Sequence, residues 1–291
     1  MSLIKYQILL KTVELGGITK AAEALGYTQS AASRMIAALE QEWDMELLVR
    51  SRGGVRLSGA GETLLPYLRA VCGAHKELEE QVADLHGLTR GTLRVGTFTS
   101  VSIHWLPPIM KQFLHRYPGI RFELVSSWEF AEIEDMVHQG AVDCGFLGLP
   151  AGEGLDVIPL RQDRLLAVLP PDHPLAHAPC YPMERFVQDP YIRINEERDV
   201  EISRIFQEEG IHPNLQYTVN DDFAILSMVE QGLGVSILPE LVLQSSNRTF
   251  SAVPLEHPRS RQIGVAVRSG KPLSPLTTRF LEVVRQWTAA Q

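Results

Sequence analysis

The stretch that most restricts the fold is a pair of short helices joined by a tight turn near the N-terminus. Residues 19–25 and 28–40 have the composition of helices, and Gly26 and Tyr27 lie between them. Gly26 can adopt the left-handed conformation that ends the first helix, and Thr28 can cap the second. One face of the second helix is apolar at helical spacing and should pack inward; it consists of Ala32, Ile36, Leu39 and Trp43. The opposite face is left free for another role.

That free face carries small and polar side chains, which suits it to a DNA groove. Small residues allow close approach, while hydroxyl and guanidinium groups can reach phosphates and base edges. The residues expected to contact DNA from this helix are Thr28, Gln29, Ser30, Ser33 and Arg34. An ordinary amphipathic surface helix has the same pattern, so the interpretation depends on the flanking segments.

The segments on both sides favour DNA binding. A helix from about Leu3 to Glu14 has an apolar stripe that can support the pair; the stripe consists of Leu3, Tyr6, Leu10 and Val13. Residues 47–57 predict two short strands around a Gly-Gly turn. Three arginines of this hairpin are placed to contact phosphates beside the groove: Arg50, Arg52 and Arg56. Together these elements predict a winged helix-turn-helix domain over residues 1–58 that binds double-stranded DNA.

The order of these residues closely resembles the N-terminal domain of LysR-type transcriptional regulators. The residues that carry the resemblance are Ala21, Ala22, Leu25, Ser33, Leu39, Glu40, Leu47, Arg50, Leu57, Ala60 and Gly61. The resemblance continues to the C-terminus. It implies a cytoplasmic regulator of target promoters that forms a homodimer or homotetramer, with RNA polymerase as a possible partner. It also implies a small-molecule effector and no cofactor.

Charge and cysteine content agree with this interpretation. The net charge of −8 is unevenly distributed, because residues 1–60 hold seven basic and six acidic residues while residues 91–291 hold 17 basic and 24 acidic ones. The acidic C-terminal part should be repelled by DNA. Three widely spaced cysteines argue against a disulfide framework or a zinc site and indicate a reducing cytoplasm. No stretch is apolar enough to span a membrane, and the N-terminus reads as a helix and not as a cleavable signal.

A long helix with a heptad-like stripe is predicted after the hairpin. Apolar residues recur every 3.5 positions on average; the stripe consists of Leu64, Leu68, Val71, His75, Leu78, Val82 and Leu85. We expect a linker and dimerisation helix over residues 59–89, with packing against the chain's own domains as the alternative. Pro66 predicts a bend or a late start of this helix, and residues 87–91 predict a hinge.

From residue 92 onward, strands and helices alternate, which predicts a parallel sheet covered by helices. The expected strands are 92–97, 121–126, 144–148, 165–169, 191–194, 215–219, 235–238 and 262–267. The expected helices are 106–117, 132–139, 200–209, 223–231 and 274–287. The expected fold class is therefore an α/β sensor of two lobes, preceded by an all-α winged helix-turn-helix domain and a long linker helix. The family resemblance implies the same arrangement for the sensor, similar to periplasmic binding proteins.

The effector-binding domain should span residues 90–291, with two crossovers between its lobes near residues 161–165 and 258–265. Lobe 1 is expected at about 90–161 and 266–291, and lobe 2 at about 162–265. By resemblance, the segments that line the effector pocket lie at strand ends facing the cleft. The candidate effector residues are Thr99, Ser100, Ser102, Ser127, Trp128, Arg193, Asn195 and Asn220.

Hydroxyls and free amides at residues 99–102, with Arg193 opposite, favour a small organic anion as the effector. Each hydroxyl could instead be only a helix cap, and Arg193 could be an ordinary surface ion pair. The competing expectation is a neutral or cationic ligand attracted by Asp221 and Asp222.

Enzymatic functions fit the sequence poorly. The run Gly232-Leu233-Gly234 lacks the third glycine of a dinucleotide loop, and no G-x-S-x-G, H-E-x-x-H, phosphate-binding loop or C-x-x-C motif occurs. We therefore expect no catalytic residues and no metal site. Two alternatives remain at this stage: a solute-binding protein without a regulatory role, and a winged-helix regulator of another family.

Overall fold

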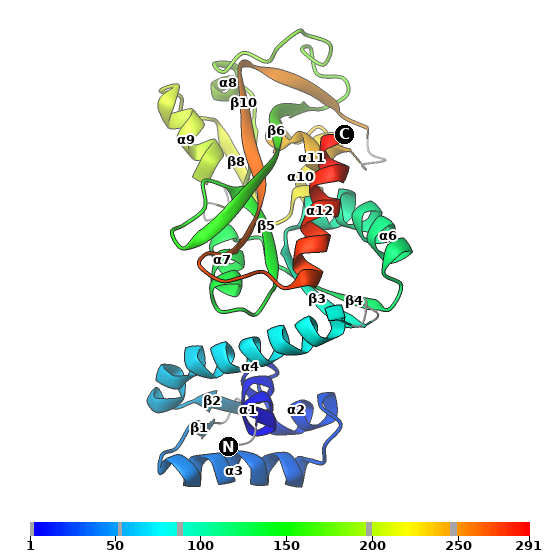
Figure 1. The fold of residues 1–291 in the computed structure, drawn as a ribbon. Helices are drawn as coiled ribbons and strands as arrows, with labels where there is room; N and C mark the ends of the chain where they lie inside the picture. The colour runs from blue at the N-terminus through cyan, green and yellow to red at the C-terminus, as the bar shows by residue number, and fades with distance from the viewer. Residues whose placement is uncertain (1–2, 52–53, 86–89, 196–199, 245–248) are drawn as a thin grey trace.

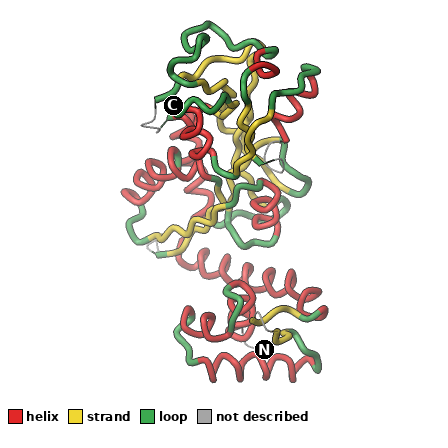
Figure 2. The backbone as a smooth tube through the Cα atoms, turned by 180° about the vertical axis from the view of Figure 1, so that it is seen from behind, coloured by secondary structure: helices red, strands yellow, loops and turns green. Residues whose placement is uncertain are grey.

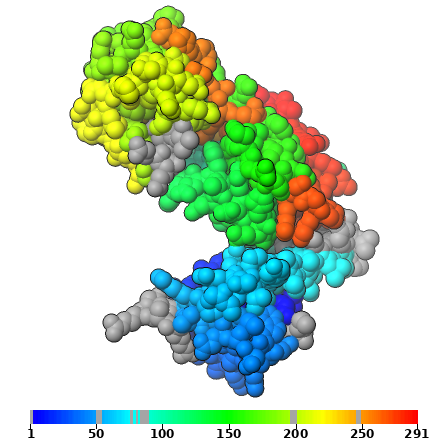
Figure 3. Space-filling model, turned by 90° about the vertical axis from the view of Figure 1, so that its left-hand side faces the viewer, coloured from blue at the N-terminus to red at the C-terminus, as the bar shows by residue number. Residues whose placement is uncertain are grey.

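The computed structural model describes residues 3–51, 54–85, 90–195, 200–244 and 249–291. The chain has a small N-terminal part and a larger C-terminal part that meet at a narrow waist (Figures 1 and 3). Helix α4 (Gly59–Leu85) lies between the two parts (Figure 1).

The N-terminal part contains the expected helix-turn-helix. It is formed by α1 (Leu3–Glu14), α2 (Ile18–Ala24) and α3 (Gln29–Trp43). Gly26 has a φ of 73°, so it occupies the left-handed conformation that the turn requires. The Thr28 hydroxyl accepts a hydrogen bond from the Ala31 amide at 3.2 Å and caps α3. Both local signals in the sequence are confirmed.

The stripe predicted for α1 is only partly correct. Of its four residues, Tyr6 alone is buried, and the fully buried positions of the helix are Ile8, Leu9 and Thr12. The reason is that α1 is packed on two sides, against α2 and α3 on one and against α4 on the other. A helix in that position buries more than a single stripe.

The hairpin that follows α3 is tied to the end of that helix. Strands β1 (Leu48–Ser51) and β2 (Gly54–Leu57) are antiparallel, with Leu48 opposite Leu57. The Glu40 carboxylate accepts hydrogen bonds from the amides of Leu47 and Leu48, at 2.7 and 3.1 Å. Gly61 lies so close to the Leu47 carbonyl that a Cβ would come within 2.3 Å of it. These contacts fix the direction in which the hairpin leaves the domain.

Helix α4 divides the predicted heptad stripe between two environments. Leu64 and Leu68 pack into the N-terminal core beside Tyr6, Leu39 and Leu47. Farther along the helix the apolar side chains are exposed: Val71 (48%), Leu78 (62%) and Val82 (48%). The expected late start was wrong, because the helix begins at Gly59 and continues through Pro66. The predicted hinge falls largely on residues 86–89, outside the described residues.

The C-terminal part is built on a six-stranded sheet in the order β4-β3-β5-β10-β6-β9. Its strands are β3 (Gly91–Thr97), β4 (Ile120–Ser126), β5 (Cys144–Leu149), β6 (Leu155–Leu169), β9 (Ser236–Pro239) and β10 (Ser251–Arg268). The predicted parallel pairing is found among β3, β4 and β5, whereas β10 and β6 of the same sheet are antiparallel to their neighbours.

The two crossovers predicted near residues 161–165 and 258–265 are themselves strands. β6 and β10 pair with each other along most of their 15 and 18 residues and run through both lobes (Figure 2). A register shift between Pro254 and Arg259 interrupts the pairing. The lobes are therefore joined by one continuous pair of strands and not by two loops.

Helices cover the sheet and complete the lobes. In lobe 1 they are α5 (Thr99–His104), α6 (Leu106–Arg116), α7 (Phe130–His138) and α12 (Pro275–Ala289). Lobe 2 adds the parallel pair β7 (Tyr191–Ile194) and β8 (Leu215–Val219) and the helices α8 (Arg185–Gln188), α9 (Val200–Glu208), α10 (Asp222–Glu230) and α11 (Glu240–Leu243). The short helices α5, α8 and α11 were not expected from the sequence.

Candidate functional site

Helix α3 lies at the outer end of the molecule, away from the C-terminal part (Figure 1). Thr28, Gln29, Ser30 and Arg34 are exposed, and Ser33 is half-buried. The inward face is buried as predicted at Ala32, Ile36 and Leu39, while Trp43 is half-buried. The Arg34 Nε atom donates a hydrogen bond to the Ser30 carbonyl at 3.3 Å, which holds its side chain along the helix.

The hairpin adds Arg56, which is exposed on β2. Arg50 lies on β1, but its side chain is outside the described parts of the chain, as is Arg52 altogether. The structure therefore places five of the eight residues predicted to contact DNA on α3 and its cap. Two more, Arg50 and Arg56, lie on the hairpin, where only the Arg56 side chain is described.

Two acidic residues near the end of α3, Glu40 and Glu42, form hydrogen bonds within the domain. Glu40 binds the amides at the start of the hairpin. Glu42 accepts a hydrogen bond from Lys5 at 3.0 Å, and this bond lowers the pKa of the Glu42 carboxyl. Both carboxylates are therefore engaged by partners within the domain.

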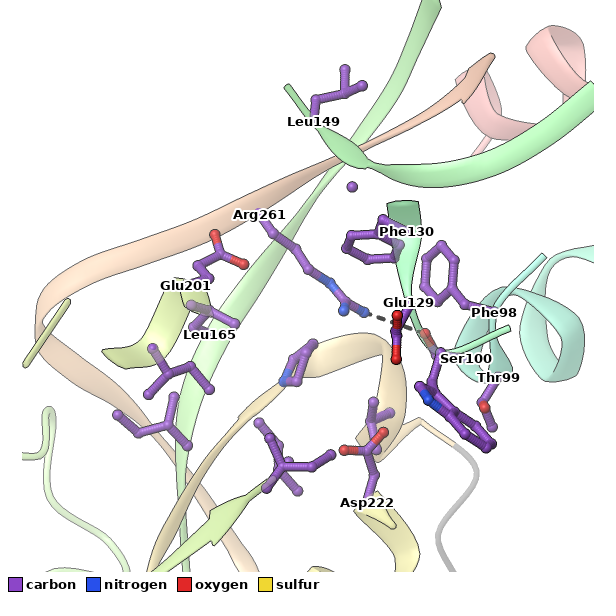
Figure 4. A pocket seen from close by; sticks show the side chains of 18 of the residues that line it. Phe98, Thr99, Ser100, Glu129, Phe130, Leu149, Leu165, Glu201, Asp222 and Arg261 are labelled. Carbon is purple, nitrogen blue, oxygen red and sulfur yellow. Dashed lines mark hydrogen bonds between the residues drawn. The ribbon is translucent and has the colours of Figure 1, made fainter. Parts of the chain in front are cut away.

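A cleft of about 420 Å³ lies between the two lobes (Figure 4). Its wall is largely apolar and aromatic, with a few charged groups. Lobe 1 supplies Phe98, Thr99, Ser100, Trp128, Glu129 and Phe130, the crossing strands supply Leu165 and Arg261, and lobe 2 supplies Ile194, Glu201, Ile202, Arg204, Asp222 and Ile237. Apolar walls with a few fixed polar groups are typical of small-molecule sites.

Arg261 is the most firmly held polar group of this cleft. Its Nη2 atom lies 2.8 Å from the Asp163 carboxylate and donates to the Ser100 hydroxyl at 3.3 Å, and its Nε also donates to Asp163 at 2.9 Å. The guanidinium carbon lies 5.3 Å from the centre of the Phe98 ring, within cation–π range. The Arg261 and Asp163 side chains are only 14% and 5% exposed. The guanidinium is thus fixed before any ligand arrives (Figure 4).

Carboxylates also line the cleft. Glu201 lies beside Arg261 in Figure 4, and Glu129 and Asp222 lie lower in the same view. Burial raises the pKa of the Glu201 carboxyl, although the positive charge of Arg261 opposes this change. The cleft therefore contains both signs of charge in a mainly apolar wall.

Three of the eight predicted effector residues line the cleft: Thr99, Ser100 and Trp128. Ser102 instead donates to the Thr97 hydroxyl at 3.1 Å. Ser127 is buried and donates to the Glu132 carboxylate at 2.5 Å, while its oxygen accepts from the Glu129 amide. These two hydroxyls hold the loops that carry the lining residues.

The structure does not bring Arg193 to the cleft. Ile194 lines the cleft, and side chains alternate along a strand, so Arg193 of β7 points to the other side, into a separate crevice with Ser203 and His212. The backbone amide of Asn195 donates a hydrogen bond to the Val219 carbonyl. Neither Asn195 nor Asn220 lines the cleft. Asp221 caps α10 by accepting from two backbone amides, whereas Asp222 lines the cleft.

Sequence reasoning missed Arg261 and Glu201. The available signal for Arg261 was that it lies within residues 258–265, which were expected to cross between the lobes. In the described parts of the chain, no group of three or more metal-ligating side chains occurs, and no helix is long and apolar enough to span a membrane.

A helix-turn-helix domain with an exposed polar helix, joined to a two-lobed α/β domain with a cleft, defines a ligand-responsive DNA-binding regulator. Comparison with known families agrees. The family described as "Bacterial regulatory helix-turn-helix protein, lysR family" matches residues 3–62, and the "LysR substrate binding domain" matches residues 86–289. The chain belongs to the LysR family of transcriptional regulators, which are DNA-binding proteins with an effector-binding domain and not enzymes.

Individual relatives extend over the whole chain. The probable HTH-type transcriptional regulator LrrA of Synechococcus elongatus is 32% identical, covering 98% of this chain and 97% of its own length. A full-length OxyR variant from Pseudomonas aeruginosa has a similar fold, with a TM-score of 0.77, 21% identity and coverage of 99% of this chain and 94% of its own. Full-length CbnR in complex with its target DNA is also similar, with a TM-score of 0.69, 22% identity and coverage of 98% and 99%.

Proposed function

We propose that this regulator controls its promoters in response to a small organic anion with an apolar body, bound between the two lobes. The observation that carries the proposal is the Arg261 guanidinium, held in a mainly apolar cleft by Asp163 and Ser100. Arginine recognises carboxylate and similar planar anions through paired hydrogen bonds.

The geometry around Arg261 leaves part of its guanidinium available to a ligand. Asp163 and Ser100 take up Nε and Nη2, while Nη1 makes no hydrogen bond within the described residues. An anion bound at Nη1 would lie in a cleft that Phe130, Ile202 and Ile237 also line, so these side chains are available to its carbon skeleton. Burial of that skeleton supplies affinity, and the arginine supplies orientation.

The competing proposal is a neutral or cationic effector. The observation in its favour is that Glu129, Glu201 and Asp222 line the same cleft and outnumber the two arginines there. Asp221 drops out of this alternative because its carboxylate caps α10. A ligand of this class would gain its charged contacts from these carboxylates, Glu129 of lobe 1 and Glu201 and Asp222 of lobe 2, and would be indifferent to Arg261.

Calorimetry on the full chain separates the two proposals. A thermal-shift screen of small carboxylates, sulfonates and amines first identifies a ligand, since a bound ligand stabilises the folded state by mass action. Ser100→Ala and Arg261→Gln should then each weaken binding by about 1–3 kcal/mol, the range for losing a partner to a charged group. Arg193→Gln, which removes an arginine outside the cleft, is the control. Unchanged affinity in both cleft variants would reject the anion proposal.

For the rest of the molecule, we propose residues 1–58 as the DNA-binding domain, 59–89 as the linker and 90–291 as the effector domain. The exposed apolar side chains Val71, Leu78 and Val82 favour a homodimer through α4, and hence a DNA site with two-fold symmetry. A homotetramer and a contact with RNA polymerase extend the same proposal. The compartment that we propose is the cytoplasm, because the target is DNA.

A further inference from the structure

A second, smaller crevice lies at the waist of the molecule, between the linker helix and lobe 1. Its volume is about 80 Å³. Helix α4 contributes Arg69 beside the small residues Ala70 and Gly73, and lobe 1 contributes the segment from Arg268 to Thr277 and the turn before β5. None of these residues lines the effector cleft, so the two sites are separate.

The charged groups around this crevice are mainly positive. Arg69, Arg268 and Lys271 line it together with a single carboxylate, Asp143. The Asp143 carboxylate accepts a hydrogen bond from the Arg94 amide at 2.7 Å, which ties it to β3. Within the described parts of the chain, none of the three basic residues forms an ion pair. Three like charges therefore face one another across a junction between domains.

These basic groups are not simply solvated surface residues. Arg69, Arg268 and Lys271 are all half-buried. Burial lowers the pKa of Arg69, and the negative charge of Glu14 offsets only part of that change. Half-buried like charges repel one another more strongly than exposed ones, because less water screens them. Without a counter-charge, the repulsion would push α4 away from lobe 1.

Polar groups suited to an anion complete the lining. The Gln139 side chain is exposed at the rim, and the crevice ends at the start of the 15-residue helix α12. There the Ser274 hydroxyl accepts a hydrogen bond from the Thr277 amide, so this amide is not available to an anion. The helix therefore acts on an anion mainly through its dipole. A volume of 80 Å³ exceeds what a single water needs, and it excludes a large ligand body.

We propose that this crevice binds a tetrahedral oxyanion, either inorganic phosphate or sulfate or the phosphoryl group of a small molecule. The anion bridges Arg69 of the linker helix and Arg268 and Lys271 of lobe 1. Arginine forms paired hydrogen bonds with phosphate oxygens, and lysine adds a compact charge. An anion that contacts both parts holds the linker helix against lobe 1, so it favours this arrangement of the DNA-binding domain relative to the sensor.

The test uses the full chain and sodium phosphate, with sodium chloride at matched ionic strength as the reference. Phosphate should bind in a calorimetric titration and raise the unfolding temperature more than chloride does. Arg69→Gln, Arg268→Gln and Lys271→Gln should each weaken phosphate binding by about tenfold or more, as expected for loss of a charged partner. Arg285→Gln, with the same change of charge at an exposed position of α12, should bind phosphate as the wild type does.

Two further outcomes decide the proposal. Without phosphate, the Arg268→Gln and Lys271→Gln variants should be as stable as the wild type or more so, because each removes like-charge repulsion. If both variants lose stability while phosphate affinity stays unchanged, the basic residues are structural and the site does not exist. The proposal is also wrong if phosphate raises the unfolding temperature no more than chloride does at the same ionic strength. Competition between phenyl phosphate and inorganic phosphate distinguishes a phosphoryl group from the free ion as the occupant.

Discussion

The α3 surface and the effector cleft differ in how far their charged groups are exposed to water. The α3 surface lies at the end of the molecule, and its polar groups, Ser30 and Arg34 among them, are exposed. The effector cleft is concave, and its arginine is 14% exposed and held by a buried carboxylate. Exposed charges act over a distance and are screened by salt, whereas a half-buried, pre-positioned charge acts at contact and is screened little.

The difference explains how one chain can serve two ligands without interference. DNA is a polyanion that is bound by summing many modest contacts along a surface. A small molecule offers few groups, so each contact must be fixed in advance by the protein.

The largest effect should come from removing the arginines expected to contact DNA. Replacing all four with alanine should weaken operator binding by about a thousandfold or more, since one base contact alone is worth about 1–3 kcal/mol. The four residues are Arg34, Arg50, Arg52 and Arg56. Fluorescence anisotropy on the operator measures the loss, and effector affinity should not change.

A control variant should remove the same charge from the sensor surface. The exposed residues for it are Lys111, Arg116, Arg121 and Arg285. This variant should bind the operator about as well as the wild type. If the four-arginine variant of the N-terminal domain still bound at wild-type concentrations, the assignment of the DNA surface would be wrong.

The next largest difference should be in how strongly salt weakens binding at the two surfaces. Raising salt from about 50 to 200 mM should weaken DNA binding by about a hundredfold or more, because each neutralised phosphate releases counterions. Effector affinity should change by less than about threefold, since Arg261 is shielded from solvent. Titrations of the same preparation at several salt concentrations measure both slopes. Equal slopes would remove the distinction between the surfaces.

The exposed half of α4 should govern assembly. Leu78→Glu together with Val82→Glu places like charges across the proposed dimer seam, at a cost of several kcal/mol. The dimer should dissociate in sedimentation experiments, and tight operator binding should be lost with it. Leu68 is unsuitable for this test, because it is 3% exposed in the N-terminal core.

The matched control puts glutamates at apolar residues that are exposed elsewhere, Val187 and Leu233. It should sediment as the wild type does. Dissociation of the control, or an unchanged mass of the α4 variant, would argue against a seam on α4.

The smallest effects should appear in the pH dependence of stability. The pKa of Glu42 is lowered in the folded state by Lys5, so its stabilising contribution is present at neutral pH and is lost as pH falls through the folded pKa. The pKa of Glu201 is raised by burial, so its ionised form costs stability at neutral pH, and this cost disappears as pH falls. Glu42→Gln should therefore lower the free energy of unfolding at pH 7, and Glu201→Gln should raise it. Urea unfolding at pH 7 and pH 4 measures both, and equal signs would contradict the assignment.

The DNA-binding domain could be predicted from sequence because its determinants are local. Gly26 ends one helix and Thr28 starts the next, and each signal acts within a few residues. The burial of α1 was harder to predict, because three neighbouring helices pack around it and a one-sided stripe cannot describe that. For α4, the heptad pattern correctly predicted a helix. The pattern alone does not show that the first half of the helix packs into the N-terminal core while the apolar side chains of the second half are exposed.

The cleft could be predicted only in outline because its parts are far apart in the chain. Arg261 and Asp163 are 98 residues apart, and they meet only through the pairing of β6 with β10. Thr99 and Ser100 were found because they follow a strand directly. The prediction that Arg193 lies in the cleft was wrong. Side chains alternate along β7, so adjacent residues point to opposite sides; Ile194 lines the cleft, and Arg193 lies in the separate crevice.

The central claim is that a ligand held by Arg261 changes how the α3 surface meets DNA. The most direct measurement is operator binding as a function of effector concentration, in the wild type and in Arg261→Gln, with the ligand found by the screen. Effector-free DNA affinity should be the same in both proteins, and the variant should need about tenfold or more effector for the same response. Superimposable response curves would contradict this claim.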